Sequence, residues 1–156
     1  MSKTGRFDTM QTYVACFMIV REGDKVAMIK RKNTNWMDDY WTLPAGKVEI
    51  NESPRLGAIR EAKEEVGIDV ALDDVKHVIS VVRLDDDSDW VDVYFEASKW
   101  SGDARNAEPE KASEMAWHDI NNLPDNVVPT VKSTLEAIAR GDNYTEYGFE
   151  SKTIDT

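Results

Sequence analysis

The segment from residue 53 to residue 67 carries the clearest helix signals in this 156-residue sequence. Ser53 is a favoured N-cap residue, Pro54 fits the first helical position, and Gly67 is suited to end a helix. Small and apolar residues recur between these ends at helical spacing: Leu56, Ala58, Ile59, Ala62 and Val66. The sequence therefore predicts a helix with one face packed against another layer of structure.

The rest of the chain alternates short apolar runs with turn signals, which is typical of strands. The expected strands are residues 13–20, 25–31, 40–43, 75–84, 91–100 and 115–117. The first two flank a turn containing Gly23 and should form a hairpin, and the acidic residues 85–89 form the turn between the fourth and fifth. A second helix is predicted from Val128 to Arg140, ended by Gly141.

Strands with two intervening helices predict an α/β or α+β sandwich. No repeat, low-complexity tract or Gly/Ser/Pro-rich linker divides the sequence. We therefore expect residues 1–156 to form one domain with its core at about residues 13–140 and short extensions at both ends.

Charge and composition exclude several classes of partner and site. A net charge of −11 repels polyphosphate backbones, so no nucleic acid polymer is expected as a partner. The sequence has no apolar run of about 18 residues and no signal-peptide pattern at its start, so we expect a cytoplasmic protein with no membrane partner. Cys16 has no second cysteine to pair with, and with only His77 and His118 beside it a metal would have to be held by carboxylates.

Three such carboxylates crowd one side of the predicted helix. Glu61 and Glu65 lie one turn apart, and Glu64 follows Glu61 by three residues. Their repulsion costs only about 0.2–0.5 kcal/mol per exposed pair, so a solvated face balanced by Arg60 and Lys63 is one interpretation. The other is a site for Mg²⁺, which takes oxygen ligands from a few carboxylates together with substrate phosphate and water.

Residues 46–68 resemble the signature of the Nudix hydrolase family, and residues 41–49 resemble the strand and loop that enter it in MutT-like members. Eight defining positions are occupied at the required spacings, by Gly46, Glu52, Arg60, Glu61, Glu64, Glu65, Gly67 and Ile68. Ala62 is the one position that differs slightly from the signature, because it is small where a larger aliphatic residue is often found. The resemblance implies an α/β/α sandwich with a mixed, mostly antiparallel sheet between helices, over about residues 13–140.

The resemblance also implies roles for these residues. The family's metal ligands correspond to Glu61, Glu64 and Glu65, with a backbone carbonyl from Ala45 or Gly46. Arg60 and Glu52 resemble the pair that orients this cluster. The implied metal is Mg²⁺, with Mn²⁺ as a substitute.

Family members often add a carboxylate from a later loop. Glu110 is our first candidate for this carboxylate and Glu108 the second. Each is equally compatible with being a solvated loop glutamate. Glu61, Glu64 and Glu110 are the alternatives for the general base, and the sequence does not choose among them.

The implied reaction is hydrolysis of a nucleoside diphosphate linked to another group. Subclasses acting on ADP-ribose tend to carry a proline about 15 residues past the signature, and dinucleoside polyphosphate hydrolases often carry a tyrosine a little further on; residues 82–86 have neither. This favours a nucleoside triphosphate, canonical or oxidised, cleaved to monophosphate and pyrophosphate. Nucleotide sugars, ADP-ribose and dinucleoside polyphosphates are alternatives. A non-catalytic nucleotide-binding module is a further alternative, disfavoured because every signature glutamate is retained.

Residues outside the signature must select the organic end of the substrate. Trp36 and Tyr40 are the favoured stacking candidates, ahead of Phe17, Trp90 and Trp117, although each residue is also compatible with packing. Arg31, within the basic run 30–32, and Lys47 are candidates for phosphate contact.

The remaining features indicate structural roles. Cys16 is expected to be a buried thiol, and His77 and His118 are expected to be structural or solvated. The aromatic tail, residues 143–149, packs either on the body or on a second subunit, which leaves a homodimer open.

Overall fold

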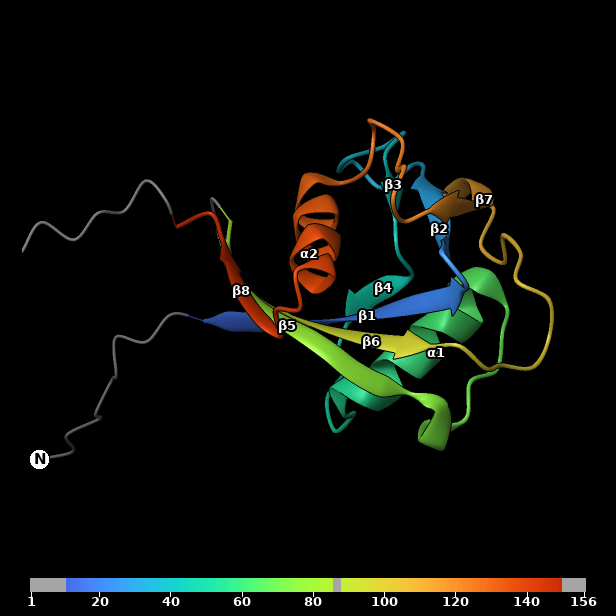
Figure 1. Ribbon diagram of the computed structural model, residues 1–156, viewed down its shortest axis with the longest axis horizontal. Helices are drawn as coiled ribbons and strands as arrows, with labels where there is room; N and C mark the ends of the chain where they lie inside the picture. Colours follow the sequence, from blue (N-terminus) through green and yellow to red (C-terminus); the bar gives the residue numbers. More distant parts are fainter. Residues whose placement is uncertain (1–10, 86–87, 150–156) are drawn as a thin grey trace, which may run out of the picture.

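The computed structural model describes residues 11–85 and 88–149 (Figure 1). The expected terminal extensions, apart from residues 11–12 and 141–149, lie outside the described residues, as do Asp86 and Asp87 of the acidic turn. The strands are β1 Thr12–Glu22, β2 Lys25–Arg31, β3 Trp41–Thr42, β4 Ala45–Lys47, β5 Lys76–Leu84, β6 Asp89–Ala97, β7 Ala112–Asp119 and β8 Tyr144–Tyr147. The helices are α1 Pro54–Val66, the short 3-10 helix η1 Leu72–Asp74, and α2 Pro129–Ala139.

The strands form one mixed sheet in the order β3-β2-β1-β6-β5-β8, with β4 also paired to β1 and β7 to β2. The pairs β1·β6 and β5·β8 are parallel, and the other pairs are antiparallel. The expected first hairpin is present, with Glu22 opposite Lys25 across a turn in which Gly23 has a φ of 62°. The predicted α/β fold with a mostly antiparallel sheet is confirmed.

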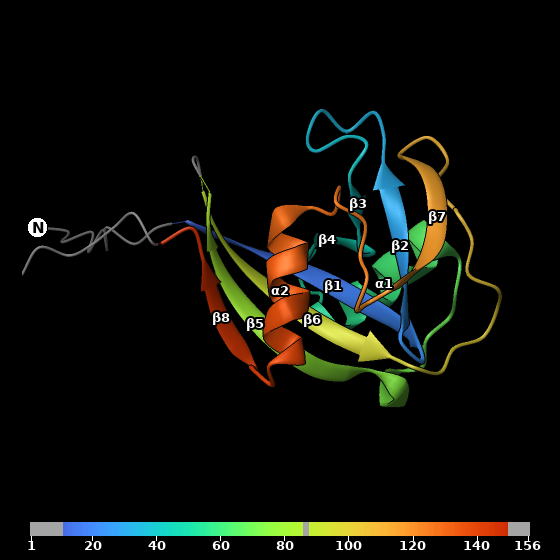
Figure 2. The same cartoon turned by 45° about the horizontal axis from the view of Figure 1, so that its top comes forward.

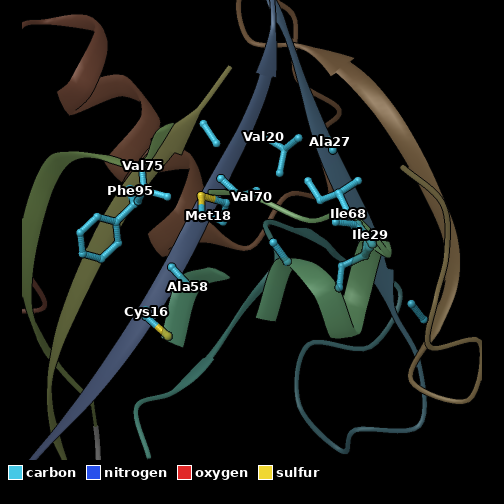
Figure 3. Close-up of a cluster of buried hydrophobic side chains, with 14 residues drawn as sticks. Cys16, Met18, Val20, Ala27, Ile29, Ala58, Ile68, Val70, Val75 and Phe95 are labelled. Carbon is cyan, nitrogen blue, oxygen red and sulfur yellow. The ribbon is translucent and has the colours of Figure 1, made fainter. Parts of the chain in front are cut away.

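The two helices cover opposite faces of the sheet (Figures 1 and 2). Side chains alternate across β1, so Cys16 and Met18 join the core beneath α1, whereas Ile19 joins the core beneath α2. Figure 3 shows the first of these cores, in which Ala58 of α1 lies close to the β1 side chains. Small residues on α1 let the helix approach the sheet, and this approach fixes the height of the α1 carboxylates above β1 and β4.

Three elements were not expected from the sequence: β4, η1 and β8. The tail strand β8 pairs in parallel with β5, with Ser80 opposite Tyr144, so this part of the tail packs on the body of the domain. The expected strand at 115–117 extends to the whole of β7, because it pairs along β2 from Lys25 to Arg31. These pairings are long-range, and local patterns do not report them.

No helix among residues 11–85 and 88–149 is long and apolar enough to span a membrane.

Candidate functional site

Helix α1 forms one wall of the candidate site, and its ends follow the sequence signals. The Ser53 hydroxyl accepts a hydrogen bond from the Leu56 amide at 3.2 Å, and Gly67 ends the helix with a φ of 71°. A regular helix between these ends fixes the directions of the glutamates at 61, 64 and 65 relative to one another.

Arg60 ties the carboxylates of this region together. Its Nε and Nη2 donate to the two carboxylate oxygens of Glu52 at 2.8 and 3.0 Å. Its Nη1 donates to Glu61 at 2.8 Å and to Glu64 at 3.2 Å. The hydrogen bonds to Glu52 are the main cause of the raised pKa of Arg60, and those from Arg60 are the main cause of the lowered pKa of Glu52. The structure thus brings together Arg60 and Glu52, the pair that the family resemblance implied.

Glu61 and Glu65 form a carboxyl pair against β4. The Glu61 carboxylate lies directly on Gly46, where a Cβ atom would collide with it. Burial raises the pKa of Glu65 well above its usual value, and a hydrogen bond to Glu61 and the charge of Glu61 raise it further. The Ala45 amide donates to Glu65 at 3.4 Å and opposes this rise. Two adjacent carboxyls in such a place need a proton or a cation between them.

The carboxylate oxygens of Glu61, Glu64 and Glu65 suit a hard divalent cation, although they do not already surround a common point. Within the described residues, no three Asp, Glu, His or Cys side chains converge as a preformed metal site. Glu64 is half-exposed and turned toward Arg60, beside the Glu61–Glu65 pair. A cation at this pair would balance the charge of the two carboxyls and would be surrounded by carboxylate oxygens, the ligands that Mg²⁺ and Mn²⁺ prefer.

These carboxylates face a cavity of about 440 Å³. We call Glu61, Glu64, Glu65 and Glu108 its carboxylate wall, and Ala15, Phe17, Arg83 and Trp90 its sheet wall. The other lining residues are Ile29, Arg31, Thr34, Trp36, Thr42, Leu43, Ala45, Gly46, Lys47, Lys111, Ala112, Val128, Thr130 and Val131. The combination of carboxylates, cations and aromatic rings in one cavity is typical of a ligand site.

The cavity collects most, but not all, of the residues predicted for the substrate. Arg31, Trp36 and Lys47 line it, whereas Tyr40 is absent from its lining. Trp117 is also absent, and stacks on Trp100 with ring centroids 5.9 Å apart.

Glu108, our second candidate for a later carboxylate, lines the cavity, and Glu110, our first, does not. The Glu108 side chain is 19% exposed and forms an ion pair with Lys111 at 3.5 Å. Its charge contributes to the raised pKa of Glu65. Two residues along, Glu110 is exposed. The carboxylate that this loop contributes to the cavity is therefore that of Glu108.

The segment from residue 32 to residue 40, which we call the 32–40 loop, places Trp36 at the cavity. The Asp38 carboxylate accepts hydrogen bonds from the amide and hydroxyl of Thr34 and from the Asn35 amide. Arg31 donates to the Trp36 carbonyl at 2.8 Å and to the Thr34 hydroxyl at 2.9 Å, and its guanidinium lies 4.9 Å from the Trp36 ring centroid. Burial lowers the pKa of Arg31. Trp36 is thus held against a cation, with 46% of the residue exposed.

Sequence reasoning missed Arg83 of the sheet wall and its ion-pair partner Asp92, which does not line the cavity. Arg83 Nε donates to Asp92 at 2.8 Å and Nη2 donates at 3.2 Å. A signal was present, because alternation along β5 and β6 places each of them on the same face as the buried residues Val81 and Tyr94. A charged residue at an inward strand position predicts either a pair or a site.

The other polar candidates are Cys16, His77 and His118, and each contacts neighbouring residues of the fold. The Cys16 thiol is buried and donates to the Gly46 carbonyl at 3.4 Å, and burial raises its pKa to about 12. His77 is exposed beside Ser80, while His118 lies edge-on to Trp41 and burial lowers its pKa.

The comparisons with known proteins indicate one family. The family described as the NUDIX domain matches residues 9–138. An uncharacterized Nudix hydrolase of Bacillus subtilis is 31% identical over 67% of this chain. An 8-oxo-dGTP diphosphatase of Proteus vulgaris is 35% identical over 45% of the chain, and an ADP-ribose pyrophosphatase of Methanocaldococcus jannaschii is 31% identical over 71%. The matched regions cover 65%, 66% and 64% of these relatives' own lengths, respectively.

The fold has a similar solved counterpart. The crystal structure of a MutT NUDIX hydrolase from Burkholderia pseudomallei superposes with a TM-score of 0.74 at 27% sequence identity, covering 81% of this chain and 97% of that one.

Proposed function

This chain belongs to the Nudix family, and on that premise we propose that it hydrolyses a phosphoanhydride bond in a nucleotide with the help of a divalent metal ion. The observation that carries the proposal is the carboxyl pair Glu61–Glu65, packed on Gly46 within a cavity that also presents Arg31 and Trp36. Such a cavity can hold a cation, a chain of phosphates and an aromatic base at once.

Nudix hydrolases generally use divalent metal ions, and for this chain we propose Mg²⁺, with Mn²⁺ as a substitute. Glu61 and Glu65 would hold the ion together with Glu64, which would turn away from Arg60, and with a backbone carbonyl of Ala45 or Gly46. Bound there, it would supply positive charge to the phosphate oxygens during attack by water.

The other residues in the proposal orient and bind. Arg60, fixed by Glu52, keeps Glu61 in place, as partners of metal-binding carboxylates commonly do. Arg31 and Lys47 bring positive charge to the cavity, and we assign them to phosphate oxygens; in the absence of substrate Lys47 Nζ lies 4.9 Å from the Tyr13 ring centroid, and Arg31 donates to the Trp36 carbonyl. Trp36 would stack on the organic end of the substrate.

For the substrate we propose a nucleoside triphosphate, canonical or oxidised, cleaved to monophosphate and pyrophosphate. The relative named 8-oxo-dGTP diphosphatase supports it. ADP-ribose is the second candidate, because the relative named ADP-ribose pyrophosphatase matches over a larger share of this chain.

A substrate panel tests the proposal. Canonical and oxidised nucleoside triphosphates, ADP-ribose, a nucleotide sugar and a dinucleoside polyphosphate are incubated with Mg²⁺, with Mn²⁺ or with a chelator, and the products are identified. Pyrophosphate release from a triphosphate that stops with the chelator is expected. Activity confined to ADP-ribose or a nucleotide sugar would contradict the proposed substrate but would agree with the proposed hydrolysis of a phosphoanhydride bond. No release from any substrate with either ion would favour a non-catalytic module.

The proposal includes a small-molecule partner and no nucleic acid polymer. A cytoplasmic location and a homodimer also remain predictions, which cell fractionation and light scattering would check.

A further inference from the structure

One member of the carboxylate wall, Glu108, does not lie on α1. It belongs to residues 105–111, which we call the 105–111 loop, in the connection from β6 to β7 (Figure 1). Its side chain is 19% exposed, and its charge contributes to the raised pKa of Glu65, so the two carboxyls act on each other. A helix sets the directions of the other three glutamates, but a loop needs separate contacts to hold a carboxylate at the cavity.

The start of the 105–111 loop is bound to the C-terminal end of α1. The Arg105 amide donates to the Val66 carbonyl at 3.0 Å, and the Arg105 guanidinium donates to the Gly67 carbonyl at 3.3 Å. The Ala107 amide donates to the Glu65 carbonyl at 3.1 Å. The last carbonyls of a helix have no helical donors, so these bonds satisfy groups that need partners. They also join the loop to one residue of the carboxyl pair.

Asn106 lies between these two amides and connects the start of the loop with the first residue of β7. Its Nδ2 donates to the carbonyl of Ala112, six residues further along the chain, at 2.8 Å. The amides of Lys111 and Ala112 both donate to the Glu108 carbonyl, at 2.9 and 3.0 Å. The hydrogen bond from Asn106 therefore closes a short ring of chain that contains Glu108.

The oxygen of the Asn106 amide has no such bond. Oδ1 is buried and accepts no hydrogen bond from the described residues. The Ala112 carbonyl can only accept, so the amide cannot be turned around to pair Oδ1 there. A buried acceptor without a donor costs free energy, which makes stability alone a poor reason for an asparagine at this position. What the side chain does provide is the geometry of the loop.

The remaining contacts of the loop hold its far end. The Lys32 amide donates to the Lys111 carbonyl at 2.9 Å, and Lys32 Nζ donates to the Pro109 carbonyl at 3.2 Å. Asn33 Nδ2 donates to the Glu110 carbonyl at 3.5 Å. The Glu108 carboxylate itself has an ion pair with Lys111 at 3.5 Å, but the Lys111 side chain is 71% exposed, and such pairs fix orientation weakly.

We propose that Asn106 is a positioning residue: its bond to the Ala112 carbonyl holds the Glu108 carboxylate at the cavity, beside Glu65, where the reaction needs it. The inference rests on the proposed hydrolysis, in which Glu108 adds a carboxylate to the three on α1. Asn106 does not line the cavity, so it should act on the rate through Glu108 and not through contact with the nucleotide.

Steady-state kinetics of two variants test this role. Asn106→Leu keeps a side chain of similar size without a donor, and Asn106→Ala introduces no bulk, so whichever variant folds decides the question. We expect kcat to fall roughly 10- to 100-fold, as it does for partners that orient the ligands of a metal site, and KM to stay within roughly twofold of the wild type. An unchanged kcat in a folded variant would overturn the inference.

A double-variant cycle with Glu108→Gln assigns the effect to Glu108. Glu108→Gln alone should lower kcat at least roughly 10-fold, and adding the Asn106 substitution should lower it by no more than roughly a further twofold. Two effects that multiply would show that Asn106 acts elsewhere and would contradict the proposal. A normal kcat in Glu108→Gln would contradict it as well, because no functional carboxylate would then need positioning.

Amide hydrogen exchange, measured by NMR without substrate or metal, gives a readout apart from turnover. In the Asn106 variant the Lys111 and Ala112 amides should exchange at least roughly fivefold faster than in the wild type, while amides within α1, such as that of Ala62, should not change. Unchanged exchange at both loop amides would refute the inference. If the wild type cleaves no substrate, the proposed function fails, and these exchange rates alone decide whether Asn106 holds the loop.

Asn126→Leu is the matched control. Asn126 Nδ2 donates to the Asp39 carbonyl, also at 2.8 Å, at the end of the 32–40 loop. Losing this bond should raise KM and leave both kcat and exchange in the 105–111 loop unchanged. An equal fall in kcat would mean that loosening either loop slows the reaction, which would remove the specific role of Asn106.

Discussion

Helix α1 and the 32–40 loop both contribute to the same cavity, but their conformations are held in different ways. In α1 the backbone forms a regular helix, and the glutamates occupy directions that the helix dictates. In the loop, Asn33, Asn35, Met37 and Asp39 all have positive φ values, between 47° and 69°. These are sparsely populated conformations for residues other than glycine, so side-chain hydrogen bonds have to hold them.

Because of this difference, side chains on α1 and in the 32–40 loop should respond differently to substitutions nearby. On α1 the helical backbone sets the direction of each carboxylate, and neighbours such as Arg60 and Gly46 adjust its final position. Trp36 keeps its place only while Asp38 and Arg31 bind the loop. Substitutions in α1 should therefore act on the chemical step, and substitutions in the loop should act on binding.

The largest effect is expected from removing a carboxylate charge of α1. Glu64→Gln or Glu65→Gln should lower metal-dependent kcat by at least about 100-fold, a loss typical of a preorganised charge at a reacting centre. In Glu64→Gln stability should change little, because Glu64 is 48% exposed and surface ion pairs contribute less than about 1 kcal/mol. Steady-state kinetics and thermal melts measure the two effects.

Lys63→Gln is the control on the same helix, since Lys63 pairs with Asp69 on the exposed side. It should leave kcat unchanged. Near-normal metal-dependent rates in both glutamine variants would defeat the assignment of α1.

A smaller loss is expected from Gly46→Ala. The new Cβ would collide with the Glu61 carboxylate, so the carboxyl pair must shift, and activity should fall roughly 10- to 100-fold. Overpacking of this kind costs about 1–3 kcal/mol of unfolding free energy.

Gly23→Ala gives a comparison with strain but no collision, because Gly23 has a φ of 62° and nothing within 4 Å of the added Cβ. It should cost about 1–2 kcal/mol and leave activity intact. Equal activity loss in the two variants would mean that the contact with Glu61 is irrelevant to the site.

The loop should show a weaker effect of a different kind. Asp38→Ala removes the acceptor of three hydrogen-bond donors, so Trp36 should move more freely and KM for the nucleotide should rise roughly 3- to 10-fold at constant kcat. Asp38→Asn retains a carbonyl acceptor and should recover part of the affinity. A fall in kcat without a change in KM would show that the loop acts on the chemical step, as α1 does, and not on binding.

The smallest effect is expected at the cap of α1. Ser53→Ala removes the bond to the Leu56 amide and should cost about 1 kcal/mol of unfolding free energy. Activity should stay within roughly twofold of the wild type, because the rest of the helix holds the glutamates. A large loss of activity at unchanged stability would show that the helix does not carry the carboxylates independently of its cap.

The sequence alone determined the features that depend on local spacing. Helix signals at Ser53 and Gly67 predicted α1, and the spacing of Glu61 and Glu65 predicted that they would meet. Strand alternation and the Gly23 turn predicted the first hairpin. In each case the interacting groups lie within a few residues of one another, so the order of residues already fixes their geometry.

Only the tertiary structure decided the rest. Glu108 rather than Glu110 lines the cavity because the loop that carries them is held by bonds to distant segments, such as the one from Lys32 to the Pro109 carbonyl. β8 exists because β5 offers it an edge, and Arg83 meets Asp92 because two strands pair in one register. These contacts depend on how separate parts of the chain are brought together, and a residue's neighbours in sequence carry no direct record of that arrangement.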